Sequence, residues 1–385
     1  MTQVVQPPAS PGFVKGLEGV IASKTKIGFV DGMGGRLVYR GININELAEF
    51  SNFEETAYLL FYGQLPKAGE LAQFKARLQK YRQLPESVLQ IIKMVARETH
   101  PMAALRTAIS SLGCFDPDVE STEMEKYSEI GLKLITQVAT AAAAVYRARK
   151  GQEPIRPDPS LDHTANFLYM CSGKKTDDFE TKVMDVCLIL HADHGMNAST
   201  FTSMVVISSL SDFYSAITAA IGSLKGTLHG GANEQVIRML MEIGSVEKTE
   251  AYIKRAIENK KKIPGFGHRV YKTYDPRAII LSQYSERVTT QLGTKYLYDI
   301  AKKVEDLVVR VYGERGIFPN VDFFSGSIYH SFGFESPMYP VLFAVARIAG
   351  WVARVLEYLP ENKIYRPKAL YEGLLDNHYI PMDQR

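Results

Sequence analysis

The residues between Lys260 and Arg277 carry the densest set of chemically useful groups in the sequence. Three lysines precede a turn rich in proline and glycine, where a ligand can approach the backbone closely because glycine has no side chain. The turn delivers His268, and Arg277 follows it nine residues later. This stretch therefore combines several cations with a titratable imidazole. The combination predicts an anionic substrate and acid–base chemistry. The stretch is not a dinucleotide fingerprint, because it lacks the third glycine and a preceding apolar strand.

Two further motifs contain histidines. His229 lies between glycines, before a helix predicted to begin near Ala232, whose N-terminal N–H groups disfavour an imidazolium. A neutral His229 would polarise a carbonyl, and the alternative is a histidine in a tight turn between helices. His191 and His194 are three residues apart at the end of an apolar helix. That spacing is compatible with a metal-binding pair, with helix-terminal histidines favoured by the dipole, or with His194 as a donor to an anionic ligand.

A carboxylate and two arginines occupy unusual positions. Asp322 is flanked by apolar residues, which predicts a raised pKa suited to a base for weakly acidic carbon. The alternative is an N-cap aspartate before a short helix. Arg347 lies inside the apolar run 341–352, where it must snorkel, pair or bind an anion. Arg366 precedes a proline in an extended stretch, near an edge or a subunit boundary. Taken alone, each arginine is typical of a structural residue.

The elements that must position these groups are almost all helical. Residues 27–39, with Asp31-Gly-Met-Gly-Gly between two apolar runs, predict a β-hairpin. Beyond residue 44 the apolar spacing is that of helices. The clearest helical segments are predicted at 86–97, 101–112, 125–149, 160–172, 178–192, 197–210, 212–224, 231–243, 247–259, 275–292, 294–313 and 337–357. The apolar stretches 204–224 and 341–356 contain charged residues, so we expect buried helices and no membrane span.

The composition is that of a large globular protein. With 385 residues and 46% apolar content, the chain can bury a large core in one or two domains. A net charge of +3 does not indicate a nucleic-acid binder. Three widely spaced cysteines without a CxxC pair favour a reducing, cytoplasmic setting. The first eight residues lack a basic start and an apolar core, so we expect no signal peptide.

Six motifs, in this order, resemble the citrate synthase family in its shorter bacterial and archaeal form. They are His194-Gly-Met-Asn-Ala-Ser, Leu228-His229-Gly-Gly-Ala-Asn, Pro264-Gly-Phe-Gly-His268, Asp275-Pro-Arg277, Asn320-Val-Asp322 and Arg366-Pro367. The resemblance implies a mainly α, citrate synthase-like two-domain fold with a small N-terminal β-hairpin. It implies a large helical domain at 1–230 and 330–385 and a small mobile domain at 231–329, with the active-site cleft between them.

The resemblance also implies a reaction, the condensation of acetyl-CoA with oxaloacetate followed by hydrolysis of citryl-CoA to citrate and CoA. Asp322 would remove a proton from the acetyl methyl group. His229 would hydrogen-bond the thioester oxygen, and His268 would polarise and protonate the keto oxygen of oxaloacetate. The alternative is 2-methylcitrate synthase, which takes propionyl-CoA and shares these residues.

The remaining implied roles concern binding. The residues that would hold oxaloacetate are His194, Arg277, Arg347 and Arg366. Those that would line the CoA site are Lys261, Lys262, Ile263, Pro264 and Gly265. The family implies no metal, no cofactor apart from the CoA substrate, and a homodimer in which Arg366 reaches the partner subunit's site. Neither nucleic acid nor a membrane is expected as a partner.

Overall fold

The structure is a computed structural model that describes residues 12–385. One unit runs from Thr25 to Lys363, and a second combines the chain up to Lys24 with Ile364–Arg385. The second unit contains the 3-10 turns η1 (Lys15–Leu17) and η5 (Met382–Gln384), and the Tyr365 hydroxyl donates a 3.3 Å hydrogen bond to the Ala22 carbonyl. The expectation about a signal peptide concerns residues outside the described part of the chain.

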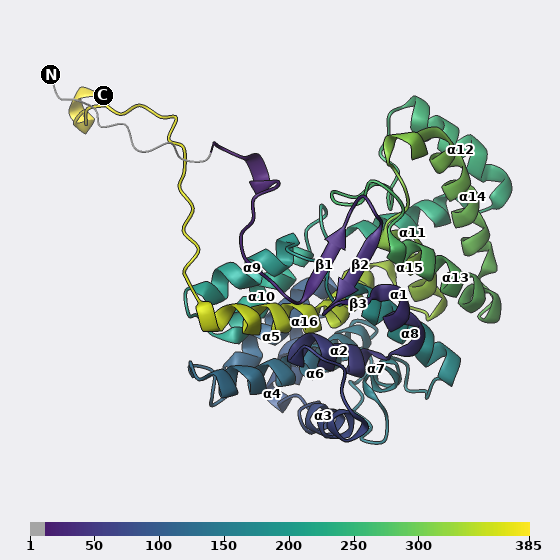
Figure 1. The fold of residues 1–385 in the computed structure, drawn as a ribbon, viewed down its shortest axis with the longest axis horizontal. Helices are drawn as coiled ribbons and strands as arrows, with labels where there is room; N and C mark the ends of the chain where they lie inside the picture. Colours follow the sequence, from purple (N-terminus) through teal and green to yellow (C-terminus); the bar gives the residue numbers. More distant parts are fainter. Residues whose placement is uncertain (1–11) are drawn as a thin grey trace. The chain divides into compact units, whose positions relative to one another are not determined.

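Helices dominate the larger unit, which confirms the mainly α fold (Figure 1). The first half contains α1 (Ile44–Phe50), α2 (Phe53–Tyr62), α3 (Ala68–Lys80), α4 (Glu86–Val95), α5 (Pro101–Gly113), α6 (Met124–Arg149), α7 (His163–Ser172) and α8 (Asp178–His191). The second half contains α9 (Ala198–Ser208), α10 (Phe213–Leu224), α11 (Ala232–Ile243), α12 (Val246–Glu258), α13 (Pro276–Gln291), α14 (Lys295–Tyr312), α15 (Val321–Ser331) and α16 (Tyr339–Tyr358). Three further 3-10 turns are η2 (Gly313–Arg315), η3 (Ser336–Met338) and η4 (Leu359–Glu361).

The predicted hairpin is confirmed as β1 (Gly28–Asp31) and β2 (Arg36–Tyr39), which pair antiparallel. Asp31 Oδ1 accepts hydrogen bonds from the N–H groups of Met33 (3.0 Å) and Gly34 (2.9 Å), which closes the turn. A third strand, β3 (Ile42–Asn43), pairs antiparallel with β2. The sequence did not indicate β3, because two residues are too few to show an alternating pattern.

Helix α16 runs through the core of the larger unit and packs against α2, α6, α8 and α9 (Figure 1). The segment Ser336–Glu361 that contains it has 26 residues, and an 18-residue window of it reaches a mean hydropathy of 1.4. In length and apolarity it could cross a membrane, but 94% of that window is buried inside the protein. The expectation of a buried helix at 341–356 is therefore confirmed, and α9 and α10, which account for 204–224, pack against each other.

Helix α15 was not among the predicted helical segments. Every residue from Val321 to Tyr329 is buried, so no polar face alternates with an apolar one. Helical periodicity in a sequence depends on that alternation, and its absence explains the omission. Helix α15 packs against α11 and α13, while α12 packs against α14, and these helices gather on one side of Figure 1. They correspond to the predicted small domain at 231–329, whose division from the rest stays a prediction.

Close packing between α16 and the end of α8 depends on one glycine. A Cβ atom at Gly350 would lie 2.1 Å from the carbonyl oxygen of Ala192. That residue begins the loop that carries His194. A side chain at position 350 would therefore push the helix away from the histidine loop.

We expect Gly350→Ala to lower the free energy of unfolding by about 3 kcal/mol or more, because backbone cannot yield as a flexible side chain can. The matched control is Gly222→Ala in α10, where the new Cβ would meet only the Arg106 side chain at 3.7 Å. That substitution should stabilise the protein slightly, since alanine favours helices by about 1 kcal/mol over glycine. Thermal unfolding of both variants measures the difference, and equal melting temperatures would contradict the packing argument.

Candidate active site

Two predicted site histidines lie together with a tyrosine. The ring centroids of His194 and His268 are 5.0 Å apart, and the Tyr271 ring lies 5.4 Å from His194 and 4.9 Å from His268. The Tyr271 hydroxyl is 3.2 Å from Nε2 of His194. The loop after α8 and the glycine turn before α13 thus meet, although 74 residues separate the two histidines in the sequence.

The hydrogen bonds of His268 determine where its proton lies. Nδ1 accepts hydrogen bonds from the backbone N–H groups of Val270 (3.0 Å) and Tyr271 (3.2 Å). The proton of the neutral ring is therefore on Nε2. Burial and the charge of Arg277 lower the pKa of His268 to about 4, so the ring is neutral at pH 7. His268 presents an N–H donor at the cluster.

His229 has the opposite tautomer. Its Nε2 accepts a 3.3 Å hydrogen bond from the backbone N–H of Ser199 and lies 2.8 Å from the Ser199 hydroxyl. The ring proton is therefore on Nδ1. Burial and the charge of Arg347 lower the pKa of His229 to about 4. Helix α11 begins at Ala232 as predicted, and the neutral imidazole expected from the sequence is confirmed, although burial and a cation are the causes that the structure shows.

Asp322 is the second residue of α15, and only 9% of it is exposed. The cap is Asn320, whose Oδ1 accepts a 3.1 Å hydrogen bond from the Asp322 N–H, so the N-cap alternative for Asp322 is wrong. Burial raises the pKa of Asp322 to about 7 despite the opposing charge of Arg277. Its Oδ1 has no hydrogen-bond partner among residues 12–385. The direction of the pKa shift agrees with the sequence prediction.

Backbone hydrogen bonds join the glycine turn to the segment before Asp322, although about fifty residues separate them in the sequence. The Gly267 N–H donates to the Phe318 carbonyl (2.9 Å), and the Asn320 N–H donates to the Gly265 carbonyl (2.9 Å). Asn320 Nδ2 also donates to the Gly267 carbonyl at 2.9 Å. Gly265 and Gly267 have φ angles of 78° and 79°, which favour glycine. These bonds hold the start of α15 against the segment that carries His268.

Two buried arginines lie in this region, and they differ in whether a carboxylate neutralises the charge of the guanidinium. Asp275 binds Arg277 in a bidentate ion pair, with Nε–Oδ1 at 2.9 Å and Nη2–Oδ2 at 2.7 Å. Arg347 donates from Nε to the His191 carbonyl at 2.5 Å, and its guanidinium lies 4.7 Å from the Phe343 ring centroid. No carboxylate of the described chain forms a salt bridge with it, and burial lowers its pKa to about 10. Arg347 is therefore a buried cation that can accept an anionic ligand.

The comparisons with known proteins agree with this geometry. The family model described as "Citrate synthase, C-terminal domain" matches residues 16–368. The citrate synthase of Deinococcus radiodurans is 46% identical over 96% of this chain and 98% of its own length, and citrate synthase 2 of Bacillus subtilis is 43% identical over 96% and 99%. The crystal structure of the Pyrobaculum aerophilum citrate synthase superposes with a TM-score of 0.92 at 41% identity, covering 99% of this chain and 97% of that one.

The chain belongs to the citrate synthase family.

A further family member is similar in structure. The citrate synthase of Thermoplasma acidophilum, solved as a ternary complex with carboxymethyl coenzyme A and oxaloacetate, has a TM-score of 0.92 and 35% identity. The match covers 98% of this chain and all of that one. In the present family member, the predicted site residues His194, His229, His268, Asp322 and the two buried arginines come from segments brought together by the fold. Arg366 is exposed and belongs to the second unit, so its role stays a prediction.

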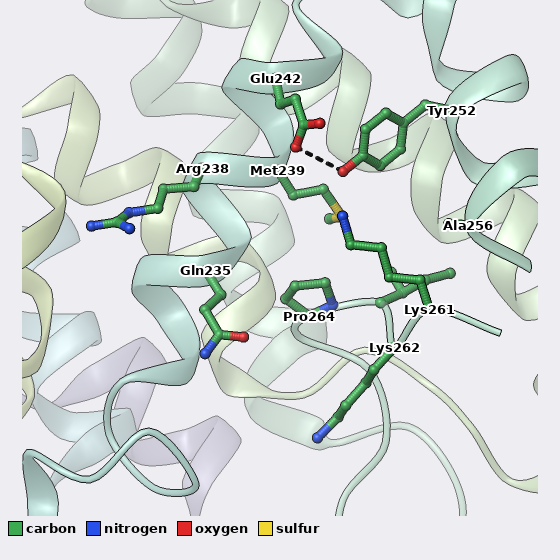
Figure 2. Close-up of a pocket in the computed structure, with 10 residues that line it drawn as sticks. Gln235, Arg238, Met239, Glu242, Tyr252, Ala256, Lys261, Lys262 and Pro264 are labelled. Atoms are coloured by element: carbon green, nitrogen blue, oxygen red, sulfur yellow. Dashed lines mark hydrogen bonds between the residues drawn. The ribbon is translucent and has the colours of Figure 1, made fainter. Parts of the chain in front are cut away.

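Four of the five residues predicted for the CoA site line one pocket in this citrate synthase family member (Figure 2). Lys261, Lys262, Ile263 and Pro264 border a pocket of about 210 Å³. Helices α11 and α12 form its opposite wall, where the Tyr252 hydroxyl donates a 2.9 Å hydrogen bond to Glu242 (Figure 2). Gly265 does not line the pocket, and a Cβ there would lie 2.7 Å from the Phe323 ring.

The alternative of a metal site at His191 and His194 has no support in the geometry. His191 Nδ1 donates to the Cys187 carbonyl at 2.7 Å, and the ring packs edge-on against Phe343. His194 turns to Tyr271 instead. Among residues 12–385, no three or more His, Cys, Asp or Glu side chains lie close enough to hold a metal ion together.

The structure adds a second buried ion pair that the sequence interpretation did not assign to the site. Arg354 binds Asp193 through Nε–Oδ1 (3.1 Å) and Nη2–Oδ2 (2.7 Å). The Tyr39 hydroxyl donates to the Asp193 carbonyl at 2.8 Å and accepts from its N–H at 3.1 Å. These contacts fix the residue before His194. A signal was present, because Arg354 follows Arg347 by seven residues and so lies on the same face of α16.

We expect Asp322→Asn to stabilise the protein at pH 8, by about 2–4 kcal/mol. The folded-state pKa lies above the unfolded value, so the ionised carboxylate costs stability. That cost is absent below pH 4, grows as the pH rises and is complete above pH 7. Chemical denaturation at pH 5 and pH 8 measures it: the gain should shrink at pH 5. A gain that is independent of pH would contradict the raised pKa.

Proposed function

We propose that this protein condenses acetyl-CoA with oxaloacetate and hydrolyses the resulting citryl-CoA to citrate and CoA. The observation that carries the proposal is the combination of one buried carboxylate of raised pKa with two neutral histidines that present N–H donors from opposite ring nitrogens. Such a set can remove a proton from carbon while it stabilises charge on two carbonyl oxygens. Membership of the citrate synthase family supports the same reaction.

In the first step Asp322 takes a proton from the methyl group of acetyl-CoA. A pKa of about 7 makes it a much stronger base than an exposed aspartate. His229 donates its Nδ1–H to the thioester oxygen, where negative charge develops as the enolate forms. His229 is neutral and its Nε2 accepts from Ser199, so its one ring proton lies on Nδ1 and is available for this hydrogen bond.

In the second step the nucleophilic carbon attacks the keto carbon of oxaloacetate. His268 donates a hydrogen bond from Nε2 to the keto oxygen and passes this proton to it as the bond forms, and the ring regains a proton from solvent before the next turnover. Arg277 and Arg347 bind the carboxylates of oxaloacetate, together with His194 and Arg366. Asp275 holds Arg277 in a fixed orientation, so this guanidinium needs no reorganisation when the dianion arrives.

The acyl carrier is bound by Lys261, Lys262, Ile263, Pro264 and Gly265. Both lysines are exposed at the pocket, where they can contact phosphates of CoA. Closure of the small domain, residues 231–329, over the large one excludes water, which strengthens the hydrogen bond from His229. The reaction requires no metal and no cofactor besides the CoA substrate.

The proposal extends to assembly and location. The protein acts as a homodimer in which Arg366 completes the site of the partner subunit. Arg366 belongs to the second unit, whereas the other predicted site residues belong to the larger one, and it is exposed. The three cysteines form no disulfide, and two of them are buried, which supports a reducing, cytoplasmic setting.

The direct test is release of the CoA thiol with oxaloacetate and either acetyl-CoA or propionyl-CoA. We expect a higher kcat/KM for acetyl-CoA, by roughly 10–200-fold, the discrimination that one methylene allows. Asp322→Ala is the control, and it should lose at least 100-fold in kcat while oxaloacetate still binds. A preference for propionyl-CoA would favour the 2-methylcitrate synthase alternative. Thiol release that is independent of oxaloacetate would contradict both.

A mixing experiment tests the shared site. Asp322→Ala and Arg366→Ala chains should each be inactive alone. When they are co-expressed, half of the dimers are mixed, and each mixed dimer has one intact site, so about a quarter of wild-type activity should return. Light scattering verifies that dimers form, and differently tagged chains verify that they mix. No recovery in well-mixed dimers would show that Arg366 does not act across subunits.

A further inference from the structure

A run of buried polar atoms without hydrogen-bond partners lies behind Asp322. In the part of the chain that the structure describes, Asp322 Oδ1, the hydroxyls of Tyr329 and Tyr339, and both amide atoms of Asn233 are buried and unpaired. Asn233, Tyr329 and Tyr339 are completely inaccessible. Proteins rarely leave such groups unpaired, so several of them in one region require an explanation.

These atoms belong to neighbouring side chains. Asp322, Gly326 and Tyr329 follow one another at spacings of four and three residues, which places them on one face of α15. A Cβ at Gly326 would lie 3.6 Å from the Asn233 carbonyl oxygen and 3.7 Å from Cε2 of Tyr339. The rings of Tyr329 and Tyr339 are 5.4 Å apart. The run therefore extends from Asp322 between α15, α11 and the start of α16.

The far end of the run reaches the protein surface. Glu234 directly follows Asn233 in the first turn of α11, and burial together with the charge of Glu234 raises the pKa of Tyr339. Glu234 is paired with Arg238, and the Arg238 side chain is 66% exposed. His100 Nε2, from the start of α5, is 4.0 Å from Glu234. Glu234 thus connects the buried hydroxyls with solvent-exposed charges.

The reaction creates a need for such a connection. Acetyl-CoA, oxaloacetate dianion and water give citrate trianion, CoA thiol and one proton, so each turnover must deliver one proton to solvent. Asp322 receives a proton from carbon and must become a carboxylate again before the next turnover. Asp322 is 9% exposed in this structure, and closure of the cleft over the substrates would remove this remaining contact with bulk solvent.

We propose that Tyr329, Tyr339 and Asn233 line a chain of buried water molecules that carries protons between Asp322 and Glu234. The inference rests on the proposed function of Asp322. Buried waters typically make about three hydrogen bonds to polar groups that are otherwise unpaired. Each tyrosine hydroxyl accepts a proton on oxygen while it donates its own, so neither ring ionises. Asn233 orients the waters through its carbonyl and amide groups, and Glu234 passes the proton to solvent.

Isotope exchange tests the relay. With acetyl-CoA that carries a trideuterated methyl group, and malate as an unreactive dicarboxylate, Asp322 removes a deuteron and solvent supplies a proton in return. We expect Tyr329→Phe and Tyr339→Phe to slow this exchange at least tenfold, because the deuteron is returned to carbon when the path is interrupted. Oxaloacetate affinity should stay unchanged. The control is Tyr127→Phe, which removes another buried hydroxyl, and it should exchange at the wild-type rate.

Wild-type exchange rates in both variants would overturn the relay, provided that wild-type protein converts oxaloacetate and acetyl-CoA to citrate in the same preparation. If it does not, the proposed function itself has failed. A second measurement does not depend on activity or on folding of the variants. A crystal structure of the wild-type protein that resolves water should contain ordered waters bonded to Tyr329, Tyr339 and Asn233, and a dry, directly bonded arrangement would also overturn the proposal.

Discussion

A buried guanidinium without its own carboxylate is the constraint on which the chemistry of this site depends. Three buried arginines lie close to the predicted site residues, and acids neutralise two of them, Arg277 through Asp275 and Arg354 through Asp193. Among residues 12–385, Arg347 contacts a carbonyl oxygen and an aromatic face and forms no salt bridge. Burial lowers the pKa values of His191, His194 and His229, and the charge of Arg347 adds to the effect, together with Arg277 at His191 and His194. The buried cation thus helps to keep the imidazoles neutral, and it is available to the anionic substrate of the proposed reaction.

Burial acts in opposite directions on the acid and on the bases of this site. Desolvation raises the pKa of Asp322 to about 7 and lowers those of His229 and His268 to about 4, so both imidazoles are uncharged at neutral pH. The carboxylate becomes more basic while the imidazoles become uncharged donors, as the proposed formation of an enolate requires. The same packing that stabilises the helical core therefore shifts all three pKa values, and for Asp322 burial outweighs the opposing charges of Arg277 and Arg347.

The positions of these groups are held mostly by backbone. Main-chain N–H groups fix the tautomers of His229 and His268, and backbone hydrogen bonds join the glycine turn to the start of α15. The positive φ angles at Gly265 and Gly267 favour glycine, and close approach excludes a side chain at Gly265 and at Gly350, which faces the Ala192 carbonyl. The proposed water chain next to Asp322 would act where the backbone does not. Its waters would hydrogen-bond to polar groups that the packing leaves without protein partners.

The sequence by itself determined the helical class, the hairpin and the residue types of the site, because periodicity, turn chemistry and short motifs are local properties of the chain. It predicted most helices to within a few residues, and it failed for α15 because a helix buried on every side shows no alternation. It predicted a raised pKa for Asp322, since apolar neighbours in sequence indicate burial, and a neutral His229, although it assigned that neutrality to the following helix and not to burial and Arg347. Only the tertiary structure decided the tautomers, the neutralisation of Arg354 by Asp193 and the bond between residues 265–267 and 318–320. These depend on contacts between segments far apart in the chain, and such contacts leave no local pattern in the sequence.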